Sequence, residues 1–561
     1  MRLQRTIGNQ AVQRLLGHGR LTSGGSRLQT KRTGAYPAVG AISLHSAKLG
    51  IIQRYGAREH TRFGEVGSMI TPVENKYIVK QGLPTYHIVD TGETASKIAA
   101  KYGVSQDFLI ARNAATYRVV DTKEGPKPVG FTKGDTLVVP GQTAAEVAAA
   151  NSVTEADILN ANAKSVQTWT MPITQTEVKG FDRGRTVIVT SGQVEVTHGA
   201  WASKAKGQRT ITIKGIDFTY GEVIALGGDL YEKPEDLYNA PKQELQDLKD
   251  LLVKEAKNPK SVGDADWERA TKGRRAGQRY LGLASRNTSH YGLHDPALTP
   301  VKSKSGVDHK SEWEKDHRLA LETAQKGDKE RALGINAFAD HYLTDAFSSG
   351  HLFHKEDVME RFEQVFDAKA QEAFFHQVAY SAWSQVGDKL DKYETFATKA
   401  GKHWNISFPE YFQQLLQGIY DDKADGKPLV LNMVVLMIHD ELNSRGVEAE
   451  NQKGDKWELS GDGKLNERSL SIGRQAVAQS QVNILNNVGN TGTLDFPALF
   501  KSVWDFVPRP SQSGTKVINQ LINQFANPSD PKTLKKAREI VVSRIDMIID
   551  GLVDRQKLKK A

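Results

Sequence analysis

The chain of 561 residues contains no cysteine. Disulfides, thiolate zinc sites and a cysteine nucleophile are therefore excluded. Any bound metal must be held by His, Asp and Glu, a ligand set that suits zinc, manganese or iron. No run of eighteen apolar residues occurs, so the sequence predicts no membrane-spanning helix. A chain of this length is expected to form more than one domain.

Acidic residues are absent from the first 55 positions, which hold seven Arg and two Lys. This segment alone accounts for the whole net charge of +9, and the remaining chain is close to neutral. We predict a disordered basic leader over residues 1–55. Its start lacks the continuous apolar core of a secretory signal. Because the rest of the chain is balanced, net charge gives no support for nucleic-acid binding by the protein body.

The leader contains the sequence LQRTIGNQAVQRLL at residues 3–16, and IIQRY follows at 51–55. It resembles the N-terminal tag, QR-x-x-GNQAV-x-RLL, of proteins encoded with extracellular contractile injection systems, the phage-tail-like particles of bacteria. The resemblance implies a protein made in the bacterial cytoplasm without a classical signal peptide. It would then be loaded into an injection particle and delivered outside the cell or into a target cell. An organelle transit peptide and a plain basic tail are the alternatives on composition.

Residues 56–83 show no clear period and are expected to form a connector. Residues 84–140 indicate the order strand, helix, helix, strand, with Thr94 capping the first helix. The segments YHIVDTGET, IAAKYGVS, LIARN and GDTLVVP resemble a LysM module with an insertion at 114–130. A weaker copy follows at 141–191, where AAEVAAANSVTEADILNANA and FDRGRTVIVT repeat the two helices and the closing strand.

The LysM resemblance implies one of two roles for these modules. LysM modules bind polymers of N-acetylglucosamine such as peptidoglycan or chitin. They also serve as assembly modules in phage-tail and injection machinery. The residues do not choose between sugar binding and protein docking.

A polar linker is expected over 192–211, a large helical domain over 212–510, and two further helices over 511–561. The predicted helices of the large domain cover 242–257, 266–285, 311–325, 333–353, 356–383, 409–420, 429–443 and 470–487. The predicted fold class is multidomain. A mainly α-helical C-terminal domain follows small α+β (β-α-α-β) modules and a disordered basic leader.

The stretch 332–354, ALGINAFADHYLTDAFSSGHLFH, is apolar and helix-compatible apart from a few polar residues. Among these, His341, Asp345 and His351 have the spacing H-x-x-x-D-x-x-x-x-x-H. A metal ion can offset the desolvation of such groups. On a helix His341 and Asp345 share one face, whereas His351 is roughly 15 Å further on. The spacing predicts two neighbouring metal positions with Asp345 as a bridge. The alternative is a core helix with a buried His–Asp pair and a capping His.

Other potential ligands recur along the same domain, beside apolar or glycine-containing sequence. They are Asp229, His290, His317, His439 and Asp440.

Together these residues resemble the zinc-dependent phospholipase C and single-strand nuclease family, all-helical enzymes with a trinuclear zinc cluster. The resemblance implies that Asp229, His290, His341 and Asp345 hold the first zinc ion. It also implies that Asp345 bridges to a second ion and that His351 is another ligand. Two or three zinc ions are therefore expected.

The sequence departs from this family in two places. The family uses an N-terminal Trp as a ligand, whereas here the domain is internal. The family also continues with H-x-x-x-E, whereas His439 is followed at the fourth position by Asn443. Asp440 could substitute for the missing carboxylate, and His317 could replace a lost ligand.

The resemblance implies hydrolysis of a phosphodiester, either a phospholipid headgroup or a nucleic acid, with Asp229 orienting or deprotonating the water. The protein would be an effector carried by a contractile injection particle. The main alternative is a catalytically inactive structural or adaptor component whose LysM modules dock it or bind cell wall. A cell-wall hydrolase ranks last, because no paired-carboxylate or amidase motif is present.

Overall fold

The computed structural model describes residues 57–79, 86–197, 205–258, 261–271, 283, 287–395, 404–405, 409–420, 423–424, 427–546, 548–549 and 558–560. The predicted leader and its tag, residues 1–55, lie outside the described residues. The chain divides into two compact units. One, here called the inserted unit, is Ile70–Thr197. The other, here called the helical unit, is built from the chain on both sides of it.

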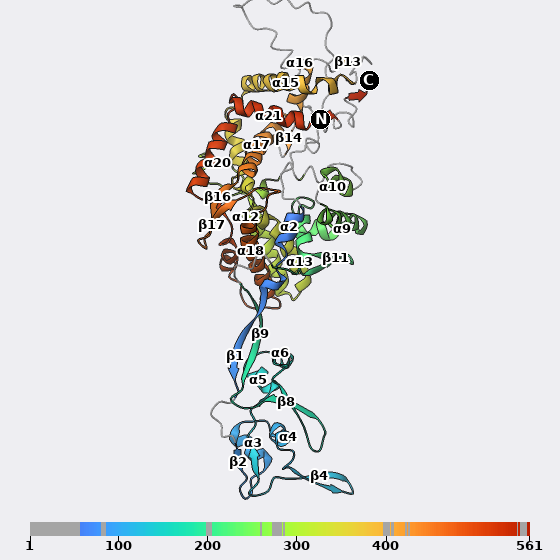
Figure 1. Ribbon diagram of the computed structural model, residues 1–561, viewed down its shortest axis with the longest axis vertical. Helices are drawn as coiled ribbons and strands as arrows, with labels where there is room; N and C mark the ends of the chain where they lie inside the picture. Colours follow the sequence, from blue (N-terminus) through green and yellow to red (C-terminus); the bar gives the residue numbers. More distant parts are fainter. Residues whose placement is uncertain are drawn as a thin grey trace, which may run out of the picture. The chain divides into compact units, whose positions relative to one another are not determined.

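The first half of the inserted unit has the predicted β-α-α-β order (Figure 1). Strand β2 (Tyr86–Ile88) pairs antiparallel with β5 (Thr136–Val138). Helix α3 (Ala95–Tyr102) begins after Thr94, whose side chain accepts a hydrogen bond from the Lys97 amide. Helix α4 (Gln106–Arg112) follows. The predicted insertion forms a hairpin of β3 (Arg118–Thr122) and β4 (Gly125–Gly130).

The second half repeats this order, but its first strand comes from an earlier part of the chain. Helices α5 (Ala144–Ala150) and α6 (Glu155–Ala161) precede a hairpin of β7 (Gln167–Thr170) and β8 (Glu177–Phe181) and the long strand β9 (Thr186–Val196). Strand β9 pairs with β1 (Ile70–Ile78). The first module therefore lies in the chain between the first strand and the first helix of the second module.

Equivalent hydrogen bonds occur in the two halves. The Asn113 side chain bonds both the carbonyl and the amide of Val138. The Asn162 side chain bonds the carbonyl and the amide of Ile188 in the same way. Each asparagine ties the end of the second helix to the closing strand, which fixes the two layers of its module.

In place of the connector expected over 56–83, the structure has an element of each unit. Helix α2 (Ala57–Phe63) packs in the helical unit, whereas β1 belongs to the inserted unit. The sequence shows no single apolar period over 56–83, because α2 and β1 pack in different units.

Helix α13 (Lys329–Asp345) forms the centre of the helical unit and is buried from Ala332 to its end. It begins after Asp328, whose side chain accepts from the Arg331 amide. Helices α12 (His309–Gln325), α7 (Tyr220–Leu226) and α18 (Glu467–Leu485) pack on it together with α2. This confirms the mostly helical C-terminal part.

Most of the later helices form a second group in which α17 packs on α14, α16, α20 and α21, whereas α19 packs on α18. Their bounds are α14 (Lys355–Glu363), α15 (Ala368–Leu390), α16 (Pro409–Tyr420), α17 (Leu429–Arg445), α19 (Phe496–Trp504), α20 (Gln512–Phe525) and α21 (Pro531–Ser543). Nearer the start of the unit lie β10 (Thr210–Ile213), β11 (Ile216–Thr219), α8 (Pro234–Asn239), α9 (Lys242–Lys257) and α10 (Asp264–Ala270). The short elements are η2 (Gly67–Met69), β6 (Gln142–Thr143), η5 (Thr288–His290), η6 (Ser349–His351), β12 (Tyr393–Thr395), β13 (Trp404–Asn405), β14 (Lys423–Ala424), β15 (Lys427–Pro428), β16 (Val447–Glu450), β17 (Lys456–Leu459), β18 (Arg509–Pro510) and β19 (Leu558–Lys560).

Two predicted helices are shorter in the structure, and most of the helix expected over 266–285 lies outside the described residues. The helix expected over 333–353 ends at Asp345, because the amide of Ser349 leaves the helix to bond the Ser460 carbonyl. The helix expected over 356–383 is divided into α14 and α15, where Asp367 caps a new start. Both breaks follow local hydrogen bonds that compete with helix continuation.

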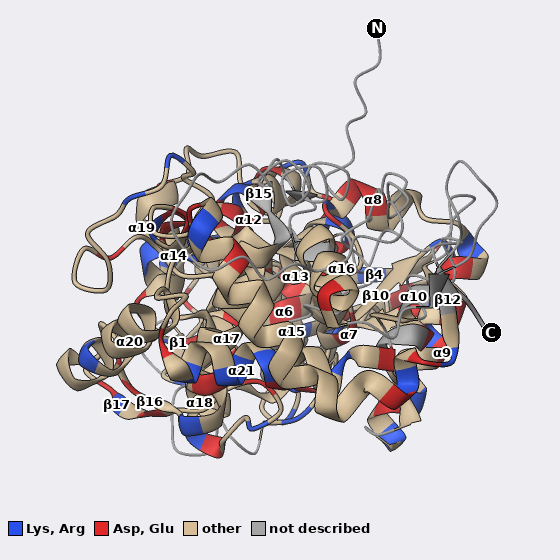
Figure 2. Cartoon of the chain, turned by 90° about the horizontal axis from the view of Figure 1, so that it is seen from above, with Lys and Arg blue, Asp and Glu red and all other residues tan. Residues whose placement is uncertain are grey.

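Basic and acidic side chains are mixed over the helices of the helical unit (Figure 2). This agrees with the near-neutral charge of the chain beyond the leader. None of the helices in the described part of the chain is long and apolar enough to cross a membrane.

Candidate metal centre

A first group of ligand atoms gathers at the end of α13. His341 and Asp345 lie one turn apart on this helix, and η5 brings His290 to them. His290 Nδ1 is 2.6 Å from Asp345 Oδ2, and His341 Nε2 is 3.2 Å from His290 Nδ1 and 3.3 Å from Asp345 Oδ2. Tetrahedral zinc with bonds of about 2.0–2.1 Å places its ligand atoms about 3.3 Å apart. Two of the three separations therefore match a zinc site without rearrangement.

A second group shares His341 with the first. His60 on α2, Asp229 after α7, and His341 offer ligand atoms that all lie within 4.8 Å of one another. His60 Nε2 is also 3.6 Å from Asp345 Oδ1. Because the other oxygen of Asp345 faces His290, this carboxylate lies between these two groups. The sequence expectation differs in two points: it put Asp229 and His290 on one ion, whereas they lie in separate groups, and it put the bridge toward His351, which lies in a third group.

Two glycines allow Asp229 to approach His341. Gly228 has φ +59°, and a Cβ there would lie 2.3 Å from His341 Cδ2 and 2.9 Å from His290 Cε1. A Cβ at Gly227 would lie 2.9 Å from the Phe338 carbonyl. Only glycine fits this turn, because a side chain at either of the two positions before Asp229 would clash with its neighbours.

Hydrogen bonds on the outer side of two imidazoles orient their inner nitrogens. His341 Nδ1 donates to the carbonyl of Ile224 on α7 at 3.0 Å. His60 Nδ1 lies 2.8 Å from Thr344 Oγ1, which itself donates to the Asp340 carbonyl. Both rings therefore turn Nε2 inward, as metal-bound histidines do.

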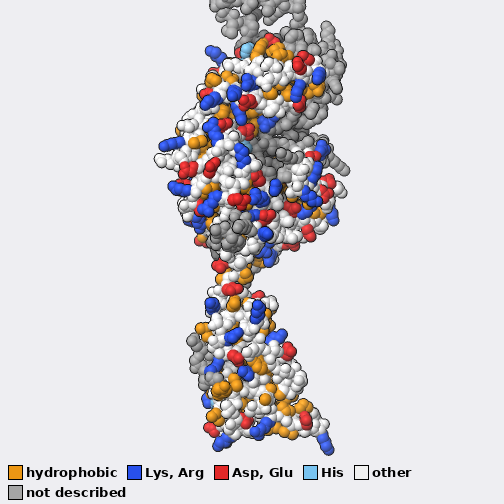
Figure 3. All heavy atoms as spheres, in the orientation of Figure 1, with side chains coloured by type: hydrophobic (Ala, Val, Ile, Leu, Met, Phe, Trp, Pro, Cys, Tyr) orange, Lys and Arg blue, Asp and Glu red, His pale blue; other side chains and the backbone are white. Residues whose placement is uncertain are grey.

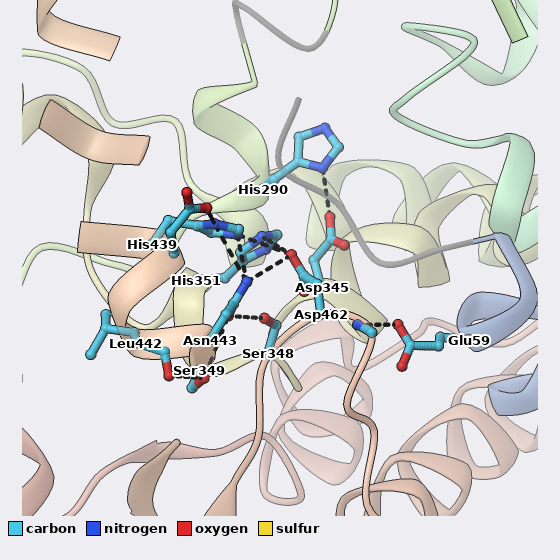
Figure 4. A network of polar contacts seen from close by, with 12 residues as sticks. Glu59, His290, Asp345, Ser348, Ser349, His351, His439, Leu442, Asn443 and Asp462 are labelled. Carbon is cyan, nitrogen blue, oxygen red and sulfur yellow. Dashed lines mark hydrogen bonds and ion pairs between the residues drawn. The ribbon is translucent and has the colours of Figure 1, made fainter. Parts of the chain in front are cut away.

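A third group lies beyond the end of α13 (Figure 4). His351 comes from η6, His439 from α17, and Asp462 from the loop after β17. Asp462 Oδ2 is 2.9 Å from His439 Nε2 and 3.8 Å from His351 Nε2. Asn443, one turn after His439, donates from Nδ2 to Asp462 Oδ2 at 3.2 Å.

Glycine again permits the close packing of this third group. A Cβ at Gly350 would lie 2.5 Å from His439 Cδ2, and one at Gly461 would lie 2.1 Å from Asn443 Oδ1. Neither backbone segment could approach α17 with a larger residue, so η6 and the Asp462 loop need glycine at these positions.

Burial controls the ionisation of the first group. It raises the pKa of the Asp345 carboxyl, which His341 and His351 only partly oppose. Burial also lowers the pKa of His290 to about 3, with Lys355 adding to the effect. A neutral imidazole is the form that binds metal. His290 is therefore ready to act as a ligand at neutral pH.

The third group is charged differently. Burial would lower the pKa of His439, but its contacts with Asp440 and Asp462 raise it to about 9. Burial would raise the pKa of Asp462, but His351 and His439 hold it below its usual range. Burial lowers the pKa of His351 despite both carboxylates. In the absence of metal, a proton on His439 therefore balances Asp462.

Several atoms of these groups are buried without a hydrogen bond, although most buried polar atoms have one. Among the described residues, Asp345 Oδ1, Asp462 Oδ1 and both ring nitrogens of His351 have no hydrogen-bond partner. Desolvating such atoms is unfavourable unless a ligand satisfies them. The donor set is His and Asp only, which suits zinc. The residues therefore fit bound zinc ions.

Two other residues considered from sequence lie outside the three groups. The His317 ring stacks on Trp313 with centroids 4.4 Å apart, and its Nδ1 contacts Asn336 Oδ1. Asp440 lies beside His439, with Oδ1 3.4 Å from His439 Nδ1, and its side chain is 38% exposed. It supports the histidine but belongs to no group.

The structure adds His60 and Asp462, which the sequence reasoning did not identify as ligands. Asp462 lies in Gly461-Asp462-Gly463, the same glycine-flanked pattern that drew attention to Asp229. His60 lies in a short helix, AREHTRF, within the expected connector. Only its tertiary placement connects it with the site.

A cavity of about 280 Å³ opens beside His290 within the described residues. Its walls include Gly228, Glu312, Lys315 and Tyr342. Charged side chains of both signs therefore border the first group on its open side.

Comparison with known proteins identifies one module of the chain. The LysM domain family matches residues 87–119, within the first module of the inserted unit. Neither a curated protein nor a solved structure matches the chain.

Proposed function

We propose that this protein is a zinc-dependent phosphodiester hydrolase, similar to phospholipase C, whose inserted unit holds it at a polymer or a particle. One observation carries the proposal: three groups of buried His and Asp side chains converge around the end of α13. The atoms of Asp345, His351 and Asp462 without hydrogen-bond partners support metal binding there.

The chain's own residues have distinct tasks in this proposal. Asp345 would contribute to two neighbouring ions, because its two oxygens face His290 and His60 respectively. Asp229 orients or deprotonates the attacking water at the same end of α13. When bound, zinc ions lower the pKa of a bound water to about 7 and neutralise phosphoryl oxygens during in-line displacement.

The surface favours a phospholipid headgroup over a nucleic acid. On the face drawn in Figure 3, Lys and Arg of the helical unit are interspersed with Asp and Glu. They do not form a continuous basic track there, and such a track is what nucleic-acid backbones need. The cavity beside His290 likewise combines Lys315 with Glu312.

The inserted unit supplies the location in this proposal. A LysM domain is a peptidoglycan-binding module, so the first module would bind peptidoglycan or a related N-acetylglucosamine polymer, or dock the protein in an injection particle. The tag resemblance favours an effector delivered by such a particle. The enzyme would then act on the target cell's phosphodiesters.

The test is the zinc content of the purified full-length protein, measured by elemental mass spectrometry. We expect about two to three zinc ions per chain, with a large loss in Asp345→Ala because both oxygens of the bridge are removed. His317→Gln is the matched control. It changes a buried histidine on the neighbouring helix α12 that belongs to no ligand group, so zinc should be retained.

Hydrolysis of phosphatidylcholine and of single-stranded DNA by the zinc-loaded protein then separates the two substrate classes. Zinc near zero, after purification without chelators and with zinc resupplied, would overturn the hydrolase proposal. The catalytically inactive structural or adaptor component would then be the better description.

A further inference from the structure

One buried hydroxyl beside the metal groups takes no part in the hydrogen bonds of the described residues. Tyr291 is fully buried, and among the described residues its hydroxyl has no hydrogen-bond partner. Buried tyrosine hydroxyls usually find one. In this same unit the buried Tyr220 hydroxyl donates to Asp340 Oδ2 at 2.8 Å. The unpaired state of Tyr291 is therefore not the general condition of this core.

The Tyr291 ring is held firmly between the first and third metal groups. It follows His290 in the chain and stacks on His351, with centroids 5.1 Å apart and planes 25° apart. The ring centroid of Phe353 lies 5.3 Å from that of Tyr291, and the His439 ring lies edge-on with its centroid 6.4 Å away. The Tyr291 carbonyl accepts from the His309 amide at 2.9 Å, which fixes the backbone.

These ring contacts would be made equally well by phenylalanine. The hydroxyl adds nothing to the packing, and leaving it unpaired lowers stability. A tyrosine phenol is protonated at neutral pH and can therefore donate a hydrogen bond.

We propose that the Tyr291 hydroxyl binds substrate, donating a hydrogen bond to a non-bridging phosphoryl oxygen of a phosphodiester held between the first and third metal groups. This inference rests on the proposed hydrolase function. A fixed neutral donor is suited to this oxygen, because it is anionic in the ground state and gains charge in the transition state. Within the described part of the chain, no protein acceptor competes for the hydroxyl.

The experiment compares full-length wild type with Tyr291→Phe, using inorganic phosphate as the binding probe and bis(p-nitrophenyl) phosphate as the substrate. We expect unchanged zinc content and a melting temperature of the metal-free protein that is unchanged or higher. Phosphate affinity and kcat/KM should each fall about 10- to 100-fold, the usual effect of losing a hydrogen bond to a charged group.

Tyr220→Phe is the matched control. It removes a buried hydroxyl that does have partners, so it should lower the melting temperature and leave phosphate affinity unchanged. A merely structural role for Tyr291 would give that same pattern.

If the zinc-loaded Tyr291→Phe variant binds phosphate and turns over substrate within twofold of wild type, the inference is wrong while the hydrolase proposal stands. If wild type holds no zinc and hydrolyses no diester, the proposed function fails and the role of Tyr291 fails with it.

Discussion

At the scale of single residues, the third group of ligand atoms takes its carboxylate from a loop and not from the helix that carries His439. The fourth position after His439 is Asn443, an amide that cannot supply negative charge. Asp462 brings the carboxylate from a separate loop, with Oδ2 2.9 Å from His439 Nε2. Asn443 then acts as a donor to Asp462 rather than as a ligand.

Asp462→Asn should therefore reduce zinc by about one ion per chain, because the third group loses its only carboxylate. It should also change the pH dependence of the metal-free protein. The folded-state pKa of His439 is about 9, above the value near 6.5 of an unfolded chain. Its contribution to the free energy of unfolding is fully present below pH 6.5 and is lost as pH rises through 9. Urea unfolding across this window should show a smaller decline in the variant.

The control for this variant is Asp440→Asn. Asp440 also raises the pKa of His439 but belongs to no group, so this change should flatten the pH dependence and keep the zinc count. Equal zinc loss in both variants would contradict the assignment of Asp462 as a ligand.

The sequence identified six residues that the structure brings into the three groups. They are Asp229, His290, His341, Asp345, His351 and His439. Spacing and glycine context were sufficient there, because these residues lie in or beside elements with a clear pattern. His60 was missed because nothing local distinguishes it, whereas Asp462 has a glycine-flanked pattern that was not linked to a ligand role. The loop of Asp462 is held by hydrogen bonds from the Gly463 and Leu465 amides to Glu59. His60 lies about 170 residues before Asp229, the next residue of its group along the chain.

At the scale of elements, the short helix α2 supports two of the three groups. His60 reaches the second group, and Glu59, one position earlier, holds the loop of Asp462 (Figure 4). The amides of Gly463 and Leu465 donate to the two Glu59 oxygens at 2.8 and 3.0 Å. Arg474 on α18 fastens the following turn by donating to the Arg62 carbonyl.

Glu59→Ala should loosen the Asp462 loop and weaken zinc binding at the third group, although Glu59 is not itself a ligand. Two hydrogen bonds to a carboxylate are lost, so we expect a destabilisation of about 1–3 kcal/mol. Zinc retention during dialysis against a weak chelator and thermal unfolding together measure the two effects.

Arg58→Ala is the comparison for Glu59→Ala, because Arg58 is exposed on the same helix. It should behave as wild type. Faster zinc loss in Arg58→Ala than in Glu59→Ala would show that α2 acts through general helix stability rather than through the Glu59 contacts.

Helix prediction succeeded where periodicity alone decides the boundaries. The ranges expected for α9 and α16 agree with the structure residue for residue. The predicted helix extends past the observed end of α13, because the Ser349 amide donates to the Ser460 carbonyl instead of continuing the helix. That contact joins residues more than a hundred positions apart, so no local pattern carries it.

At the scale of the whole molecule, the chain order differs from the order of domains. The helical unit is interrupted by the inserted unit after Met69 and resumes at His198. Within the inserted unit, Ile70 pairs with Val196, so its two ends are adjacent. Domain insertion is tolerated when chain ends meet in this way. Composition places the start of the helical domain near residue 212, and it gives no sign that α2, before the inserted unit, belongs to the same domain.

The two ends of the helical unit at this junction are also adjacent. The amide of Gly67 donates to the Gly207 carbonyl at 2.9 Å, and that of Ser68 donates to the Lys206 carbonyl at 2.9 Å. A chain lacking residues 70–197, with 198–204 kept as the link, therefore has only a short gap to close. A chain that begins at residue 212 instead lacks His60 and Glu59.

We expect the chain without residues 70–197 to keep its zinc and its diester hydrolysis within about twofold, since no ligand is removed and loop closure depends weakly on length. It should lose sedimentation with insoluble peptidoglycan or chitin.

The chain starting at residue 212 should lose zinc from the second and third groups, because α2 supplies a ligand to one and the loop contact to the other. Elemental analysis of both proteins, beside circular dichroism to establish folding, distinguishes these outcomes. Full zinc in the folded chain from residue 212 would show that the site is complete without α2, and His60 would then have to be removed from the ligand set.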